Sequence, residues 1–582
     1  MNSKSKSRLV STSGNQAGVS DTLRVVQFDL GATPKMKRNF AILAIILVVV
    51  GGLLGGLFGR LPLRSSAGPA VTAERIESDY DEAIDVINQN YVTDVDHEKV
   101  SDRSIQGMLW TLDPHSSFFT QDEFRKLNEE QASQFYGIGV SILQHHDGVY
   151  VQSPIPNTPA EKVGLRYGDR IVSVDAKDAR DWSVSEVSRK VRGEKGTSVK
   201  VRIERAGVSG PIDYEISRGG VPLPSVRNYF MLPNATGYVG LTGGFQETTA
   251  DELDIAIKDL KNQGMKNLIL DLRGNPGGLL PQAVEVASRF IPGGQTIVSV
   301  KGRSRYAISQ DIKATDGKNQ DFPLVVMING GSASASEIVA GAIQDYGRGL
   351  IVGSNSFGKG LVQRIFPLPY NTGLTLTTAR YYTPFGRSLQ RDYSNGSIYD
   401  YYTHGEDLEG TPEAAPKAEG VPVSTANGRV LFGGLGIEPD VKVSQPFSEL
   451  RGRINEAAFY FVRQLTAGQI AGFAEYRIDR QSFRPTVQQN DLPVGDKLVE
   501  AFGAFAAGDK TLGLTEQNVA SQAEYARTRI REELVTANYS NEAGVQVLLE
   551  NDPQILKALE AMGDARKMNE SVAWNRQVSL SN

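Results

Sequence analysis

The run from Leu324 to Gln363 constrains the fold of this chain more than any other stretch. An apolar strand-like segment, Leu324 to Ile328, precedes a turn of Gly, Ser and Ala and a helix-like segment from about Ala335 to Tyr346. A second apolar segment, Leu350 to Val352, then leads to a lysine between glycines, Lys359. Strands and helices that alternate in this order predict a parallel sheet covered by helices.

The same alternation begins upstream, at a strand-like segment from Gly237 to Phe245. A helix-like segment closed by Gly264, an apolar strand from Asn267 to Leu272 and the turn Arg273–Gly278 follow it. In open parallel sheets, the loops at the carboxyl ends of the strands form the binding site. We therefore expect the turns after these strands to carry the functional residues.

The turn after Ile328 contains three serines, Ser332, Ser334 and Ser336, just before a helix. Small residues let a substrate approach the backbone closely, and the amides at a helix N-terminus stabilise negative charge. Acyl transfer needs this combination of a nucleophile and donors for an oxyanion. Spacing alone does not separate the nucleophile from serines that cap the helix.

The glycines at 277 and 278 allow three interpretations. A phosphate-binding loop is disfavoured, because neither a G-x-x-x-x-G-K-[ST] nor a G-x-G-x-x-G pattern is present. A tight turn from strand to helix explains the glycines without any ligand. The third interpretation is a backbone amide directed at a developing oxyanion.

The chain offers few bases that could activate a serine. It has no cysteine and five histidines, and none of these lies between Gly237 and Tyr382. His115 is predicted to bond locally in the turn after Asp113. Lysine is the remaining common base, and Lys359 is the candidate. Its pKa must fall by about three units, equivalent to roughly 4 kcal/mol, mostly through burial. The alternative is a surface lysine in a loop.

Residues 135–218 have a different sequence pattern, which predicts short strands of alternating apolar and polar residues and two helices. This pattern resembles a PDZ domain, in which a glycine-containing loop offers amides to the C-terminal carboxylate of a peptide. That loop corresponds to Tyr136, Gly137, Ile138 and Gly139. The peptide is then added as a strand beside the next β-strand. His145 and His146, which follow that strand, are predicted to lie in a solvated turn.

An uncharged apolar segment of about 20 residues, Phe40 to Gly59, lies near the N-terminus. It is long enough to cross a bilayer as one helix. Lys35, Lys37 and Arg38 precede it, so the positive-inside rule predicts a single-pass anchor in the inner (cytoplasmic) membrane. The rest of the chain would then be extracytoplasmic, on the periplasmic side. A cleaved signal peptide is the alternative, with a cleavage site in Ser65–Ala67.

The composition argues against two kinds of function, and changes in composition along the chain indicate where its regions begin and end. A net charge of −5 without a basic field argues against nucleic-acid binding, and the absence of cysteine excludes thiolate metal sites. Residues 394–430, rich in Gly, Pro, Ser, Tyr and acids, are expected to form a surface insertion. The predicted regions are a disordered cytoplasmic tail (1–38), a transmembrane anchor (39–60), an N-terminal helical cap (71–132), a PDZ-like domain (133–220), an α/β core (221–443) and a helical C-terminal region (444–582).

Five motifs in sequence order resemble those of the carboxyl-terminal processing (tail-specific) proteases. They are L-D-P-H-S, D-L-R-G-N-P-G-G-L-L, S-A-S-A-S-E-I-V-A-G-A, F-G-K-G-L-V-Q and G-I-E-P-D, and the resemblance covers about residues 75–443. It implies an α/β fold, a crotonase-like ββα protease core with an inserted PDZ domain. It also implies that Ser334 is the nucleophile, Lys359 the general base and Gln363 the residue that positions the lysine. The oxyanion donors would be the amides of Ala335 and Gly278.

The resemblance implies a serine endopeptidase that acts on proteins with exposed C-terminal tails, and the apolar segment Phe40 to Gly59 predicts that it is anchored in the membrane. The resemblance implies no metal and no other cofactor. The helical C-terminal region is expected to bind a second copy of the chain or an adaptor protein. Two other interpretations stay open: a non-catalytic PDZ scaffold of the cell envelope, and a crotonase-like acyl-CoA enzyme, which the PDZ module and the anchor disfavour.

Overall fold

The computed structural model describes residues 72–303, 309–315, 319–394, 401–402, 422–425, 428–443, 448–488 and 490–580. The predicted tail (1–38) and transmembrane anchor (39–60) lie outside these residues. Within the described residues, no helix has both the length and the apolar character to cross a membrane. The chain divides into two compact units, Met1–Val95 and Asp96–Asn582.

The described part of the first unit is dominated by one helix, α2 (Ala73–Asn90). Thr72 caps it, because the threonine hydroxyl accepts a hydrogen bond from the Arg75 amide at 3.3 Å. The helix predicted for this stretch is confirmed. Its apolar side chains Ile76, Tyr80 and Val86 are exposed.

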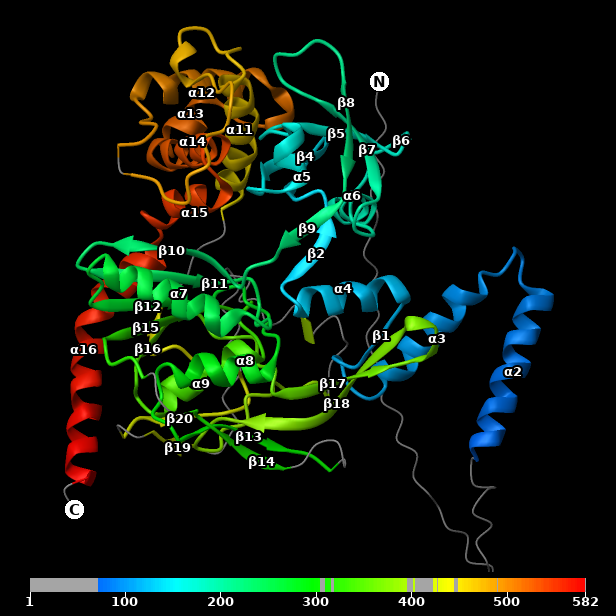
Figure 1. Ribbon diagram of the computed structural model, residues 1–582, viewed down its shortest axis with the longest axis vertical. Helices are drawn as coiled ribbons and strands as arrows, with labels where there is room; N and C mark the ends of the chain where they lie inside the picture. Colours follow the sequence, from blue (N-terminus) through cyan, green and yellow to red (C-terminus); the bar gives the residue numbers. More distant parts are fainter. Residues whose placement is uncertain are drawn as a thin grey trace, which may run out of the picture. The chain divides into compact units, whose positions relative to one another are not determined.

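A six-stranded sheet forms the centre of the second unit (Figure 1). Its order is β10-β11-β12-β15-β16-β21, and all neighbours are parallel except β10 and β11. The strands are β10 (Val226–Leu232), β11 (Thr236–Leu241), β12 (Asn267–Asp271), β15 (Leu324–Ile328), β16 (Leu350–Gly353) and β21 (Val441–Lys442). The parallel sheet predicted from the alternation of strands and helices is therefore present.

Helices cover both faces of this sheet. Leu268 and Leu270 of β12 pack with α7 (Thr249–Asn262), α8 (Leu280–Ser288) and α9 (Ala335–Asp345). Ile269, which lies between them, packs with α16 (Pro553–Leu580) instead. Successive strand residues point to opposite faces, so burial on both sides requires the continuous apolar runs seen in the sequence.

The C-terminal helices differ from the prediction in one place. The apolar pattern from Ala543 to Met562, within the predicted helical region, is typical of one helix, but the structure has two, α15 (Asn541–Leu549) and α16. Pro553 starts the second helix, because proline lacks the amide that an uninterrupted helix would use. Arg273, in the loop after β12, donates hydrogen bonds of 2.7 Å to Asp552 and Gln554. The start of α16 is thus attached to the loop after β12.

A smaller antiparallel sheet contacts α8 and α9 through β13. Its strands are β1 (Ser117–Phe119), β13 (Thr296–Lys301), β14 (Gln310–Lys313), β17 (Leu361–Pro367) and β18 (Gly373–Tyr382). Because β18 pairs with β1, β13 and β17, it brings the L-D-P-H-S turn close to the strand that follows Lys359. Helices α3 (His97–Trp110) and α4 (Gln121–Gln131) flank β1, and β19 (Val423–Ser424) pairs with β20 (Val430–Leu431).

The PDZ-like region contains an antiparallel sheet of order β3-β4-β5-β7-β8, and β6 pairs with β5. Its elements are β3 (Val140–His145), β4 (Gly148–Pro154), α5 (Pro159–Val163), β5 (Arg170–Val174), β6 (Lys177–Asp178), α6 (Val184–Val191), β7 (Ser198–Glu204) and β8 (Ile212–Ser217). β2 (Gln134–Gly137) and β9 (Gly219–Pro222) pair where the chain enters and leaves it. Strand β3 is an edge of the sheet.

A helical region packs against this module. It consists of α11 (Glu449–Thr466), α12 (Asp496–Gly508), α13 (Glu516–Ala520) and α14 (Ala523–Asn538), continued by α15. Tyr150 and Tyr167 of the PDZ-like module belong to its hydrophobic core. The Tyr167 hydroxyl also donates a hydrogen bond of 2.8 Å to the buried carboxylate of Glu533.

The same packing corrects the prediction for the paired histidines. His145 is buried, its ring stacks on Phe459 with centroids 3.6 Å apart, and its Nδ1 lies 2.9 Å from Glu456. His146 is exposed and contacts the same carboxylate at 3.0 Å. A solvated turn is therefore wrong for His145, because α11 covers it.

Candidate active site

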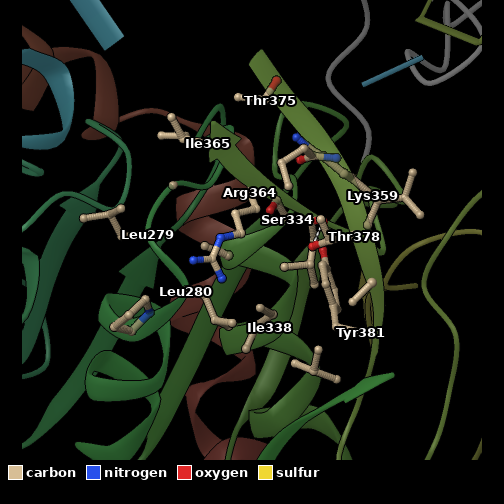
Figure 2. A pocket seen from close by; sticks show the side chains of 18 of the residues that line it. Leu279, Leu280, Ser334, Ile338, Lys359, Arg364, Ile365, Thr375, Thr378 and Tyr381 are labelled. Carbon is tan, nitrogen blue, oxygen red and sulfur yellow. Dashed lines mark hydrogen bonds between the residues drawn. The ribbon is translucent and has the colours of Figure 1, made fainter. Parts of the chain in front are cut away.

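Three loops that follow adjacent parallel strands meet at one pocket. The glycine loop follows β12, the serine turn follows β15, and the lysine loop Phe357–Gly360 follows β16. The pocket has a volume of about 540 Å³. The predicted catalytic residues that line it are Ser334, Lys359, Gln363, Gly278 and Ala335. Figure 2 shows Ser334 and Lys359 on the same side of this pocket, with Tyr381 beside them.

Ser334 has an unusual backbone conformation, with φ 55° and ψ −113°, immediately before α9. This region is sparsely populated for residues other than glycine, and such strain is typical of functional sites. The hydroxyls of the two neighbouring serines already donate hydrogen bonds to backbone carbonyls. Ser332 donates to the Leu272 carbonyl at 2.8 Å, Ser336 donates to the Asn275 carbonyl at 2.9 Å, and both side chains are buried. Only Ser334 of the three lines the pocket.

The glycine loop lies directly against the serine turn. A methyl group on Gly277 would lie 2.7 Å from Ser334 Cβ and 2.9 Å from the Ala335 nitrogen. Asn275 holds the two segments together, because its carbonyl accepts hydrogen bonds from the Ala333 amide at 3.0 Å and from the Ser336 hydroxyl. Of the three interpretations of the glycines, this contact favours the tight turn and the oxyanion donor.

Two backbone amides at this contact are available to a ligand. Ala335 is the first residue of α9, where an amide has no partner within the helix. Gly278 follows at φ 146°, and a side chain there would collide with the Phe245 carbonyl at 2.2 Å. No hydrogen bond from either amide is found within the described residues. The arrangement can therefore bind a negatively charged oxygen near Ser334.

Lys359 is half-buried in the loop after β16. Burial lowers its pKa, whereas the negative charges of Glu337 and Asp113 act in the opposite direction. The pKa is lowered on balance, so burial prevails. A lysine with a lowered pKa provides neutral amine closer to neutral pH, as a general base requires.

Glu337 connects the serine turn to the lysine loop and was missed from the sequence. One carboxylate oxygen accepts the amides of Ser334 at 2.8 Å and Lys359 at 2.9 Å. The other accepts the Ser356 hydroxyl at 2.6 Å and the Gly358 amide at 2.7 Å. Burial raises the pKa of Glu337 to about 7, although these hydrogen bonds oppose that effect. Its position three residues after Ser334 matches a helix-capping box, the one local signal for it.

The other predicted site residues lie as follows. The Gln363 amide donates to the Thr377 hydroxyl at 3.2 Å, so its role in positioning Lys359 stays a prediction. The backbone amide of His115 bonds locally as predicted, donating to Asp113 at 2.8 Å, but its imidazole does not, because Nε2 lies 2.8 Å from the Tyr401 hydroxyl. Burial and the charge of Lys359 also lower the pKa of His115 to about 3.

The predicted carboxylate loop of the PDZ-like module lies apart from the catalytic pocket. Its residues Tyr136, Gly137, Ile138 and Gly139 do not line that pocket. The Ile138 carbonyl accepts the Ala160 amide at 2.8 Å, and the Gly139 carbonyl accepts the Ile155 amide at 3.0 Å. The loop is thus anchored just before the edge strand β3.

No group of three or more His, Asp or Glu side chains is arranged to hold a metal ion within the part of the chain that the structure describes. The polar side chains that line the pocket are hydroxyls, amides, the Lys359 amine and the Arg364 guanidinium, and neither a carboxylate nor an imidazole is among its lining residues. This set suits acyl transfer through a serine and does not suit metal ligation.

Two family models match the chain. Residues 235–401 match peptidase family S41, and residues 137–214 match the PDZ domain. The first range contains the serine turn and the lysine loop, and the second contains the PDZ-like sheet. Both assignments agree with the architecture, a mixed α/β core with a PDZ domain and a helical C-terminal region.

Individual relatives point the same way. The carboxy-terminal-processing protease of Bartonella bacilliformis is 36% identical over 393 residues, which cover 64% of this chain and 88% of that protein. The carboxy-terminal processing protease CtpA of Bacillus subtilis is 34% identical over 360 residues, 61% of this chain and 76% of the relative. A solved photosystem II D1 C-terminal processing protease is 28% identical and covers 64% of this chain and 94% of its own, at a TM-score of 0.32. The chain belongs to the carboxy-terminal processing proteases, serine peptidases of family S41 with a PDZ domain.

Proposed function

We propose that Ser334 is the nucleophile of this peptidase and Lys359 its general base. The observation that carries this proposal is the shared pocket, in which Ser334 alone of the three serines is available and Lys359 is the partly buried amine. In the proposed reaction, Ser334 Oγ attacks the peptide carbonyl while Lys359 Nζ takes the hydroxyl proton. The same amine then protonates the leaving nitrogen and later activates the water that hydrolyses the acyl-enzyme.

The proposed oxyanion hole consists of the Gly278 and Ala335 amides. Both amides are available, and the N-terminus of α9 adds its positive end to the same place. Gln363 is proposed to limit the positions of the Lys359 amine from the neighbouring strand β17. This set of roles extends the serine-peptidase chemistry of the family to particular atoms of this chain.

The PDZ domain is proposed to capture the C-terminal tails of substrate proteins. The anchored Tyr136–Gly139 loop precedes β3, and an edge strand can accept an added peptide strand. Tyr136 lines a second pocket of about 570 Å³ together with Phe124 of α4. The same helix lines the catalytic pocket through Leu127 and Gln131. We therefore propose α4 as the side along which a captured tail reaches Ser334.

The wall of the catalytic pocket suggests a preference at the scissile bond. Aliphatic side chains make up much of the lining, and Figure 2 shows Leu280 and Ile338 among them, although Arg364 also lines the pocket. Each apolar group of a substrate that is buried in such a pocket stabilises the complex with the substrate. We propose that cleavage follows apolar residues in preference to charged ones.

The proposed setting of this activity is the cell envelope. The apolar segment Phe40–Gly59, after basic residues, supports a single-pass anchor in the cytoplasmic membrane with the peptidase on the periplasmic side. For the core, we propose the crotonase-like arrangement of ββα units. The proposed domain limits are 71–132, 133–220, 221–443 and 444–582, with a second copy or an adaptor as partner of the last region.

Cleavage of an unfolded protein by the purified full-length chain tests the proposed roles. Ser334→Ala and Lys359→Ala are each expected to abolish cleavage while the thermal unfolding profile stays unchanged. Ser336→Ala, which removes a buried structural hydroxyl, is the matched control and should retain activity. Cleavage by Ser334→Ala would refute the assignment of the nucleophile. Binding of a tail peptide without cleavage by the wild type would favour the scaffold interpretation.

A further inference from the structure

Tyr401 is a buried aromatic residue in the stretch that was expected to be a surface insertion. Its side chain is only 6% exposed. Its ring lies edge-on to His115, with centroids 5.3 Å apart, and to Phe357, with centroids 5.6 Å apart. The Arg391 guanidinium lies over the ring, 5.0 Å from its centroid. Phe357 begins the lysine loop, so Tyr401 packs directly against the start of that loop.

The Tyr401 hydroxyl is also linked to the lysine loop by hydrogen bonds. It accepts a hydrogen bond from the Gln390 amide at 3.1 Å, and the Gln390 oxygen accepts the Gly360 amide at 2.8 Å. On the other side of Lys359, the Gly358 carbonyl accepts the Arg391 amide at 2.9 Å. The backbone on both sides of Lys359 is therefore fixed to the segment that Tyr401 packs on.

The hydroxyl makes a second link, to the turn that precedes β1. Tyr401 Oη lies 2.8 Å from His115 Nε2. His115 is close enough to Lys359 for the charge of the lysine to lower its pKa. Tyr402 fastens the same turn, because its hydroxyl donates to the Pro114 carbonyl at 2.7 Å. Rings and a neutral imidazole thus occupy space that water would otherwise fill.

This enclosure matters because the charges around Lys359 differ in sign. The titratable or charged side chains that face the lysine loop from the surrounding elements are Glu337, Asp113, His115, Tyr381, Arg391, Tyr401 and Tyr402. Glu337 and Asp113 favour the protonated amine. Burial alone outweighs them, so any group that keeps water from Lys359 helps to keep the amine neutral.

We propose that Tyr401 is a positioning residue for Lys359: through Phe357, Gln390 and His115 it holds the Phe357–Gly360 loop in place and helps to keep water from the amine. The inference rests on the proposed role of Lys359 as the general base. It assigns a function to Tyr401, one described residue of the region that was expected to be a surface insertion.

The test compares Tyr401→Ala, which removes the ring, and Tyr401→Phe, which removes only the hydroxyl, in the full-length protein. Tyr370→Ala, at a residue that is 91% exposed, is the matched control. The first readout is the pH dependence of kcat/KM for a fluorescently labelled unfolded casein. Tyr401→Ala is expected to move the acid limb up by about one pH unit, which lowers activity about tenfold at neutral pH and restores it at alkaline pH. Tyr401→Phe is expected to lower kcat by about threefold or less, and the control to change nothing.

The second readout follows Lys359 without turnover. Trace acetylation by acetic anhydride as a function of pH, read by mass spectrometry in the Ser334→Ala background, gives the midpoint at which the Lys359 amine becomes reactive. The midpoint should rise in Tyr401→Ala and stay in place in Tyr370→Ala. If Tyr401→Ala does not fold, Tyr401→Leu, which keeps apolar bulk, should show a smaller shift in the same direction.

An unchanged midpoint, or a loss of activity that is equal at every pH, would overturn the inference and leave Tyr401 a purely structural role. Failure of the proposed function looks different, since the wild type would then cleave casein without dependence on Lys359. The acetylation midpoint distinguishes these two failures because it needs no catalysis.

Discussion

Glu337→Gln is the perturbation that most directly tests how the catalytic pocket is assembled. The carboxylate accepts four hydrogen bonds, two of them from the Ser334 and Lys359 amides. A glutamine has one acceptor oxygen, so it can keep one pair of these bonds and must oppose the other pair with its own N–H groups. The serine turn and the lysine loop would then lose their common acceptor.

The effect on stability is expected to be modest. Each hydrogen bond to a charged acceptor contributes about 1.5–3 kcal/mol, so the loss of two would cost up to about 6 kcal/mol. The glutamine side chain is also uncharged, so the variant no longer buries a negative charge. The rise of the Glu337 pKa from 4.5 to about 7 corresponds to a cost of about 3 kcal/mol for burying that charge. The two effects partly cancel, which leaves a loss on the order of 0–3 kcal/mol.

The effect on catalysis is expected to be larger. Displacement of a reacting group by about 1 Å costs roughly a hundredfold in rate, and both Ser334 and Lys359 depend on Glu337 for their backbone positions. We expect kcat to fall about a hundredfold in Glu337→Gln, with a much smaller change in KM. Steady-state cleavage of labelled casein and thermal unfolding of the same preparations measure the two quantities.

Asp345→Asn is the matched control on the same helix. Asp345 is fully buried at the far end of α9, where Arg387 donates to it at 2.6 Å and 3.0 Å. Breaking this buried pair should cost about 3–5 kcal/mol, more than Glu337→Gln, yet leave kcat within a few-fold of the wild type. If Glu337→Gln keeps its kcat, or if both variants lose kcat in proportion to stability, the positioning argument is wrong.

Three further predictions follow from the pKa shifts and the packing. The pKa of Lys359 is lowered, so cleavage should decrease as the pH falls through that value, and a flat rate between about pH 5 and 9 would contradict a lysine base. Gly277→Ala should lower kcat at least about a hundredfold, because its methyl group would collide with Ser334. Gly294→Ala is the control: its added methyl group meets no atom within 4 Å, so it should lower stability without lowering kcat. Burial and the neighbouring Glu532 raise the pKa of Glu533, so the folded state binds the proton more tightly than the unfolded state does. The unfolding temperature should therefore fall as the pH rises above about 5. Glu533→Gln should flatten this pH dependence, whereas Glu524→Gln, at an exposed position of the same helix, should leave it unchanged.

Local patterns in the sequence were sufficient for the order of the elements. Continuous apolar runs such as Leu324–Ile328 identified strands buried on both faces, and alternation with helices identified the parallel sheet. Because carboxyl ends of parallel strands share one edge, the glycine loop, the serine turn and Lys359 were expected at one site, and they line one pocket. These inferences succeed because periodicity and chain direction are properties of short segments.

Other features depend on contacts between distant segments, and only the tertiary structure decided them. The spacing of the three serines does not distinguish them. In the structure, two of their hydroxyls donate hydrogen bonds to the carbonyls of Leu272 and Asn275, some 60 residues away in the chain. His145 has the local pattern of a solvated turn, yet α11, more than 300 residues later, buries it. Tyr401 lies in a polar, glycine-rich stretch, and its partner His115 is 286 residues away. Burial and hydrogen bonding depend on which segments meet in space, and a linear pattern does not contain that information.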